Sequence, residues 1–142
     1  MKDELLFCPL GGSGEIGMNM NLFGYGQPSN HKWIMVDIGV TFADDTIPGV
    51  DLIYPDPGFI VERKDNLLGI VLTHAHEDHI GAVPYLWEYF RCPVYTTAFT
   101  AEMLRRKLVE RGIADKVPVI VVEADAKRQI GVFHVEWFKL TH

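Results

Sequence analysis

The chain is organised around one stretch of seven residues, Thr73-His74-Ala75-His76-Glu77-Asp78-His79. Three of its six histidines lie here, directly after an apolar run that predicts a short buried strand. On an extended segment, residues two apart point the same way, so His74 and His76 can reach one ion together. A turn after His76 brings Asp78 and His79 round to the same place, where they can hold a second ion. The stretch therefore predicts a metal site at the end of a strand.

The residue types decide which metals fit this site. Imidazole and carboxylate ligands without cysteine suit Zn²⁺, with Mn²⁺ and Fe²⁺ as alternatives. Two such ions ~3.5–4 Å apart can position and deprotonate a water and polarise the bond that the water attacks. A single histidine near a strand end is usually a packed or solvated residue. Four potential ligands within six residues are hard to explain by packing alone, and we therefore favour the metal site.

Composition predicts one soluble globular domain. The chain has 142 residues, enough to bury a core, with 48% hydrophobic residues and a net charge of −6. That charge argues against binding of nucleic acid through a broad basic surface of this segment alone. The sequence shows neither the pattern of a signal peptide nor an apolar run of membrane-spanning length. We therefore expect a cytoplasmic protein without a membrane partner, in which Cys8 and Cys92 are reduced, buried thiols.

Apolar runs and alternating patterns predict strands between turn-forming residues. The predicted strands cover Leu5–Leu10, Met18–Tyr25, Lys32–Asp37, Gly69–Leu72, Pro93–Thr97, Pro118–Val122 and Val132–Thr141. Helical spacing predicts a short helix over Phe59–Lys64, a second helix after a turn at residues 78–82, and a third over Thr100–Arg111 that stops at Gly112. Turns are expected at Gln27–Asn30 and Lys127–Gln129.

The helix over Thr100–Arg111 is predicted to have two distinct faces. Its buried stripe would consist of Met103, Leu104, Leu108 and Val109. Its basic patch consists of Arg105, Arg106, Lys107 and Arg111. We interpret this patch as a solvated helix face in preference to a phosphate site.

The glycine-rich stretch Gly11–Gly17 matches a dinucleotide-binding fingerprint at Gly12, Gly14 and Gly17. That fingerprint requires a helix to begin at its last glycine. Residues Met18–Tyr25 instead alternate between polar and apolar in the manner of a strand. We therefore interpret the glycines as a tight connection between two antiparallel strands.

Asp37 ends a predicted strand just before Gly39, and two interpretations of it remain open. The carboxylate is either a helix cap or solvated acid, or it accepts a hydrogen bond that orients a ligating histidine. We interpret the acids of the long loop over residues 42–59 as solvated. His134 is interpreted as a structural residue. His142, at the end of the last predicted strand, lies where a further ligand could sit.

Residues 74–79 match the HxHxDH signature of the metallo-β-lactamase fold. The match extends to Pro9–Met20, to Val36–Gly39 and to the continuation from Thr73 through Leu86, THAHEDHIGAVPYL. Together these segments resemble the ribonuclease J family, nucleases of the β-CASP branch of that fold, along essentially the whole chain. The resemblance implies an α/β fold in which residues 1–142 are the N-terminal part of a metallo-β-lactamase αβ/βα sandwich. Its sheet would be mixed and largely antiparallel, with flanking helices and with the metals at one edge.

Carried over residue by residue, the resemblance implies a centre of two zinc ions, with Mn²⁺ as an alternative. The implied ligands are His74, His76 and His142 for one ion, and Asp78 and His79 for the other. Asp37 falls on the family's first conserved acid, a support for the site, and Asp78 would also orient the attacking water as a catalytic residue. The family's bridging acid, β-CASP insertion and C-terminal region have no counterpart here. We therefore expect an N-terminal piece of a longer protein that is nearly inactive alone.

The activity that the resemblance implies is a zinc-dependent ribonuclease of RNA maturation and decay, 5′→3′ exonucleolytic with some endonucleolytic cutting. Its partner would be RNA, preferably with a 5′-monophosphate, and the full-length protein is expected to be a homo-oligomer. Two alternatives stay open. One is a small-molecule hydrolase of the same fold, such as a thioesterase or lactonase, and the other is a non-catalytic RNA-binding scaffold. The intact HxHxDH argues against the scaffold, and a β-CASP insertion after His142 would favour the nuclease over the hydrolase.

Overall fold

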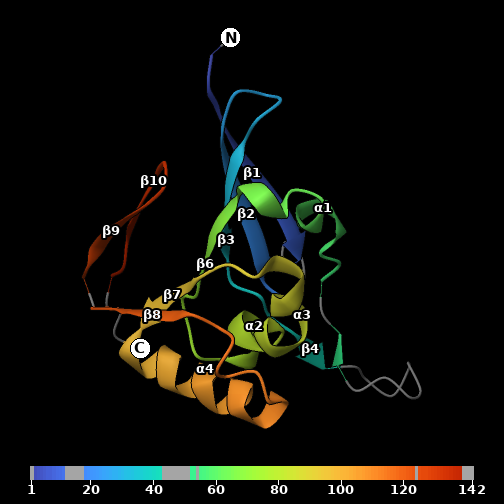
Figure 1. Cartoon of the computed structure of the whole chain (residues 1–142), viewed down its shortest axis with the longest axis vertical. Coiled ribbons are helices and arrows are strands. Elements are labelled where there is room, and N and C mark those ends of the chain that lie inside the picture. Colours follow the sequence, from blue (N-terminus) through green and yellow to red (C-terminus); the bar gives the residue numbers. More distant parts are fainter. Residues whose placement is uncertain (1, 12–17, 43–51, 54, 124, 139–142) are drawn as a thin grey trace.

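The computed structural model describes the chain except for residues 1, 12–17, 43–51, 54, 124 and 139–142. At its centre lies a six-stranded sheet (Figure 1) with the strand order β1-β2-β3-β6-β7-β8. These strands are β1 Glu4–Gly11, β2 Met20–Gly26, β3 Lys32–Val36, β6 Leu67–Val71, β7 Val94–Thr97 and β8 Val119–Val122. Two small two-stranded sheets accompany it, which are β4 Thr41–Phe42 with β5 Leu52–Ile53, and β9 Lys127–Ile130 with β10 Phe133–Glu136.

The six-stranded sheet is mixed, and its two halves are built differently. Strands β1, β2 and β3 pair in antiparallel fashion, so the glycine-rich stretch is followed by a strand and not by the helix of a nucleotide-binding fold. Strands β3, β6, β7 and β8 run parallel to one another. Over the described residues, four of the seven strand pairs are antiparallel. Because parallel neighbouring strands end at the same edge of a sheet, the C-terminal ends of β3 and β6 lie side by side at one edge.

Helices cover one face of this sheet and the β9–β10 hairpin lies against the other (Figure 1). The helices are α1 Gly58–Val61, α2 Glu77–Ile80, α3 Val83–Phe90 and α4 Ala98–Arg111, with a 3₁₀ turn at Lys64–Asn66. Side chains alternate along each strand, so Met35 and Ile70 pack against the helices while Ile34 and Val71 pack toward the hairpin. The predicted α/β class with flanking helices is confirmed.

Among the described residues, the face of the sheet beneath the hairpin is only partly covered. Leu5 and Phe7 of β1 lie on this face and are 68% and 58% exposed. Their neighbours Leu6 and Cys8 point the other way and pack against the helix-covered core. Over the described residues, helices cover one face of the sheet, whereas the opposite layer consists of the hairpin and the segment after it.

The ends of α3 and α4 follow signals in the sequence. Pro84 lies in the first turn of α3, where its missing N–H has no intrahelical partner to lose. Helix α4 ends at Gly112, whose φ of +79° is the left-handed conformation that glycine adopts readily. Trp87 of α3 is buried, and its indole N–H donates to the carbonyl of Cys92 at 2.9 Å. Helical spacing predicts that Trp87 is a core or surface aromatic residue, and the structure places it in the core.

Some local predictions are wrong. Residues 127–129, predicted as a turn, belong to β9 because their backbone pairs with β10, and the turn instead includes Gly131 at φ +58°. Val109 was assigned to the buried stripe of α4 but is exposed, because it lies about 100° around the helix from the buried Leu108. The apolar run Pro118–Val122 predicts a buried strand, yet over the described residues β8 is the outermost strand of the sheet and Val121 is exposed.

Both cysteines are free thiols, but their surroundings differ. Cys92 is buried, and the loss of hydration raises the pKa of its thiol to about 12. Because the thiolate is the reactive form, we expect the Cys92 thiol to react poorly. Cys8 is only half-buried, which corrects its predicted burial.

Within the ranges that the structure describes, no helix has the length and apolar character needed to cross a membrane.

Candidate metal centre

The three histidines of the HxHxDH stretch gather where β6 ends and α2 begins. The ring centroids of His74 and His79 lie 4.6 Å apart. Those of His74 and His76 lie 6.2 Å apart, and the two rings are within 22° of parallel. His74 and His76 precede α2 and His79 lies within it, so the short connection from strand to helix brings the rings together.

Asp78 and His79 have the separation of two ligands of one ion. The Nε2 atom of His79 lies 3.6 Å from Oδ2 of Asp78. In a tetrahedral zinc shell with bonds of ~2.0–2.2 Å, neighbouring ligand atoms lie roughly 3.4 Å apart. The two side chains can therefore hold one zinc ion with little rearrangement.

The parallel pairing of β3 with β6 places Asp37 beside the histidines. Its N–H donates to the carbonyl of Val71 at 2.8 Å, which continues that pairing by one residue. Asp37 is 4% exposed, and its carboxylate accepts hydrogen bonds from the N–H of Thr73 at 2.8 Å and from the Thr73 hydroxyl at 2.7 Å. Nδ1 of His79 lies 2.7 Å from the same carboxylate. Asp37 is thus neither a helix cap nor a solvated acid.

The contact with Asp37 decides which nitrogen of His79 can bind a metal. A carboxylate only accepts hydrogen bonds, so Nδ1 of His79 carries the proton and donates. In the neutral ring the lone pair is then on Nε2, the atom that lies near Asp78. The arrangement is the one expected of an acid that orients a metal ligand.

The same hydrogen bond raises the pKa of His79 above its ordinary value. Coulomb attraction to Asp37 and Asp78 acts in the same direction, while partial burial of the ring opposes it. A proton on Nε2 excludes a metal from that atom. Metal binding at His79 is therefore expected to weaken as the pH falls below the raised pKa.

Metal binding weakens as the pH falls, but in the metal-free protein we expect the contribution of His79 to folding stability to decrease as the pH rises. Because the folded state holds the His79 proton more tightly than the unfolded state, this stabilisation is complete below pH ~6.5 and is lost as the pH rises through the raised pKa. The measurement is the thermal unfolding midpoint of the metal-free wild type and of His79→Gln at pH about 6 and about 8. The advantage of the wild type should shrink with rising pH, and an advantage that grows would contradict the expectation.

Residues 77–79 form the motif turn, and the segment after Asp37 holds this turn through backbone hydrogen bonds. The N–H of Ile38 donates to the carbonyl of His79 at 2.8 Å, and that of Val40 donates to the carbonyl of Glu77 at 2.9 Å. These bonds lock α2 against the sheet edge. The positions of the ligands are thus set by the chain after β3 as well as by the strand that precedes them.

Asn19 is a site residue that the sequence did not reveal. Its backbone N–H and its side-chain Nδ2 both donate to the carbonyl oxygen of Asp78, at 3.0 and 2.8 Å. Its own carbonyl accepts from Gly39 at 2.9 Å. Gly39 packs so closely that an added Cβ would lie 1.7 Å from the Asp78 carbonyl oxygen. No local pattern marks Asn19, because its partner is 59 residues away.

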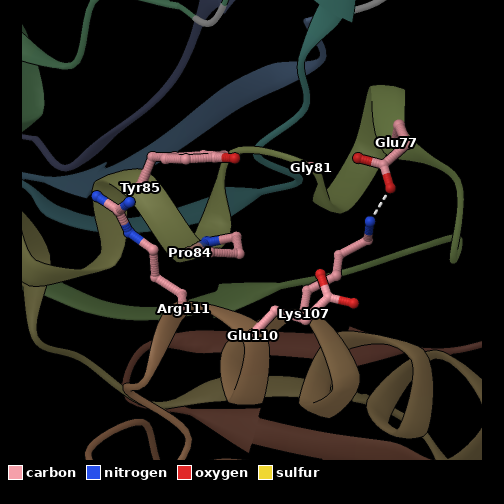
Figure 2. Close-up of a pocket in the computed structure, with 7 residues that line it drawn as sticks. All are labelled: Glu77, Gly81, Pro84, Tyr85, Lys107, Glu110 and Arg111. Carbon is pink, nitrogen blue, oxygen red and sulfur yellow. Dashed lines mark ion pairs between the residues drawn. The ribbon is translucent and has the colours of Figure 1, made fainter. Parts of the chain in front are cut away.

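Glu77 points toward α4, where it pairs with Lys107 (Figure 2). The two side chains line a hollow of about 230 Å³ whose walls are Glu77, Gly81, Pro84, Tyr85, Lys107, Glu110 and Arg111. Within it the guanidinium of Arg111 lies over the ring of Tyr85, 5.0 Å from its centroid. Part of the predicted basic patch of α4 is therefore engaged with the protein itself.

We expect Lys107→Met to change stability little. The side chains of Lys107 and Glu77 are 26% and 40% exposed, so solvent screens their attraction, and the loss should be about 1 kcal/mol or less. Lys116→Met, which removes a more exposed partner of Glu88, is the matched control. Urea denaturation of both variants measures the effect, and a loss of several kcal/mol for Lys107→Met alone would show that the ion pair is integral to the fold.

The donor types at the site fit zinc, but the described residues do not by themselves form a full ligand shell. No group of three or more His, Cys, Asp or Glu side chains among them is arranged to hold one ion. The predicted ligand His142 and the loop acids Asp44, Asp45 and Asp51 lie outside the described residues. His134, predicted to be structural, is exposed on β10. The metal-binding roles of His74, His76, Asp78 and His79, and the supporting role of Asp37, stay predictions.

Comparison with protein families gives a match to the metallo-beta-lactamase superfamily over residues 25–139. Among solved structures, a protein of unknown function from Enterococcus faecalis superimposes with a TM-score of 0.55 at 17% identity, covering 93% of this chain and 36% of that one. That likeness concerns the fold alone.

The chain is also similar to curated proteins named Ribonuclease J. The protein from Sinorhizobium meliloti is 46% identical over 140 residues, which covers 99% of this chain and 25% of the relative. The protein from Helicobacter pylori strain 26695 is 36% identical, covering 99% and 20%. Ribonuclease J 2 from Staphylococcus aureus strain NCTC 8325 is 35% identical, covering 98% and 24%. The chain thus spans a quarter or less of the length of these relatives, and the predicted resemblance is confirmed.

Proposed function

The chain belongs to the metallo-β-lactamase superfamily, and from this premise we propose that it is the metal-binding part of a ribonuclease. The proposed enzyme hydrolyses RNA with two zinc ions, as a 5′→3′ exonuclease with some endonuclease activity in RNA maturation and decay. We further propose a preference for 5′-monophosphorylated RNA, and a homo-oligomeric, cytoplasmic complete protein.

One observation carries the proposal. Three histidines and Asp78 meet at one edge of the sheet, and Asp37 holds the ring of His79 with its lone-pair nitrogen 3.6 Å from the Asp78 carboxylate. A packed or solvated histidine needs no buried carboxylate to set its tautomer. The names of the relatives supply the substrate class, RNA.

The roles of the residues follow from their donor atoms. His74 and His76, together with the predicted ligand His142, would hold one ion, and Asp78 and His79 the other. When bound, the ions supply the Lewis acidity that activates a water and stabilises charge on the attacked phosphate. Asp78 has a second carboxylate oxygen with which it can accept a hydrogen bond from the water and orient it.

The test uses the complete protein, with its natural continuation, and RNA labelled at a 5′-monophosphate. Release of labelled mononucleotide that is lost with a chelator and restored by zinc is the expected result. A second substrate with a 5′-triphosphate measures the proposed end preference. If no RNA is cleaved although the metals are bound, the ribonuclease proposal fails and a small-molecule hydrolase of the same fold takes its place.

A further inference from the structure

We propose that Thr73 is a positioning residue that extends the control of Asp37 to a second histidine, His74. The Thr73 hydroxyl would fix His74 as the tautomer with its proton on Nδ1 and its lone pair on Nε2. One buried carboxylate would then set the metal-facing nitrogen of two ligands. The inference rests on the proposed metal site.

The hydroxyl lies between the carboxylate and the ring. Its Oγ1 is 2.7 Å from Oδ2 of Asp37 and 2.9 Å from Nδ1 of His74. The backbone N–H of Thr73 donates to the other carboxylate oxygen of Asp37 at 2.8 Å. Thr73 is therefore held on Asp37 at two points, and the direction of its hydroxyl is fixed.

The direction of each proton follows from the chemistry of the groups. The carboxylate can only accept, so the single hydroxyl proton of Thr73 is directed to Asp37. Toward His74 the hydroxyl oxygen can then only accept, so Nδ1 of His74 must donate. In the neutral ring this leaves the lone pair on Nε2. Asp37 thus sets the tautomer of His74 through the Thr73 hydroxyl.

A competing contact is weaker. Thr73 Oγ1 lies 3.4 Å from Nδ1 of His79, but that nitrogen already has the shorter bond of 2.7 Å to Asp37. The hydroxyl oxygen is therefore directed to His74. Both rings, whose centroids are 4.6 Å apart, then carry their lone pairs on Nε2.

The test compares Thr73→Val, which removes the hydroxyl at nearly constant volume, with Thr73→Ser, which keeps it. Thr96→Val is the matched control. The Thr96 hydroxyl also donates a hydrogen bond, to the carbonyl of Leu72 at 3.1 Å, but among the described residues it has no hydrogen bond to a histidine. The complete, metal-free protein is labelled with ¹⁵N-histidine and studied above the pH at which its imidazoles titrate. A His74→Gln spectrum assigns the His74 signals.

In the wild type, in Thr73→Ser and in Thr96→Val we expect the ¹⁵N signature of a protonated Nδ1 at His74. In Thr73→Val the signature should shift toward the Nε2–H tautomer. Zinc affinity, measured by competition with a chromogenic chelator, should fall ~10–100-fold in Thr73→Val and stay within about threefold in the other two variants.

An unchanged His74 signature in Thr73→Val overturns the proposal, as does an equal change in Thr73→Ser or Thr96→Val, which would indicate a structural effect. Failure of the ribonuclease proposal would be a separate result. The tautomer is read in metal-free protein without RNA, so it decides the role of Thr73 whether or not the complete protein cleaves RNA.

Discussion

Replacing His76 with alanine in the complete protein is expected to abolish RNA cleavage while leaving the fold intact. The His76 side chain is exposed, so its removal should cost no more than about 0.5 kcal/mol of folding free energy. Its ring, however, faces His74 nearly in parallel and is one of the predicted ligands of the first ion. Loss of that ligand should lower turnover by at least ~10³-fold, which corresponds to about 4 kcal/mol of barrier.

The measurement is the initial rate on 5′-monophosphorylated RNA, together with the zinc content of the purified variant. His134→Ala is the control, because His134 is also exposed but lies on β10. Its rate and zinc content should match the wild type. Unchanged turnover in His76→Ala would mean that the metal site has been placed on the wrong residues.

Gly39→Ala is expected to disrupt the metal centre and to destabilise the protein strongly. The added Cβ would lie 1.7 Å from the carbonyl oxygen of Asp78 and 2.2 Å from its carbonyl carbon. Both atoms belong to the backbone of the motif turn, so no side-chain rotation relieves the overlap. The segment containing Gly39 would have to move away from the motif turn, at a cost of roughly 3 kcal/mol or more.

Thermal unfolding and zinc affinity of the variant measure this effect. Gly58→Ala is the control, since a Cβ there meets only the side chain of Asp56, at 3.2 Å. We expect wild-type behaviour from Gly58→Ala, and from Gly39→Ala a lower midpoint and much weaker zinc binding. A Gly39→Ala protein that unfolds and binds zinc like the wild type would show that the close approach is not required.

Much of the fold could be predicted because its signals are local. Strands such as β3 and β6 stand out as apolar runs, and helix α4 ends at a glycine. Strand β9 was missed because its sequence, Lys-Arg-Gln-Ile, is polar, and its backbone is ordered by the partner strand β10. The edge position of β8 was missed for a related reason, since strand order depends on pairing between distant segments.

The residues of the candidate metal centre likewise differ in whether a local sequence signal marks them. The histidines could be found because they are adjacent in the sequence and at the end of a recognisable strand. For Asp37 the sequence left two interpretations open, and the parallel pairing of β3 with β6 places it against His79, 42 residues away. Asn19 and Lys107 reach the motif turn from distant segments, and no spacing in the sequence could indicate those contacts.

The partly covered side of the sheet has a practical consequence for handling the chain. Leu5 and Phe7 present apolar side chains on that side, and over the described residues β1 and β8 are the outermost strands of the sheet. Apolar surface beside unpaired strand edges promotes aggregation, because another chain can add to the edge and bury the surface at once. We therefore expect solubility to limit preparations of these 142 residues.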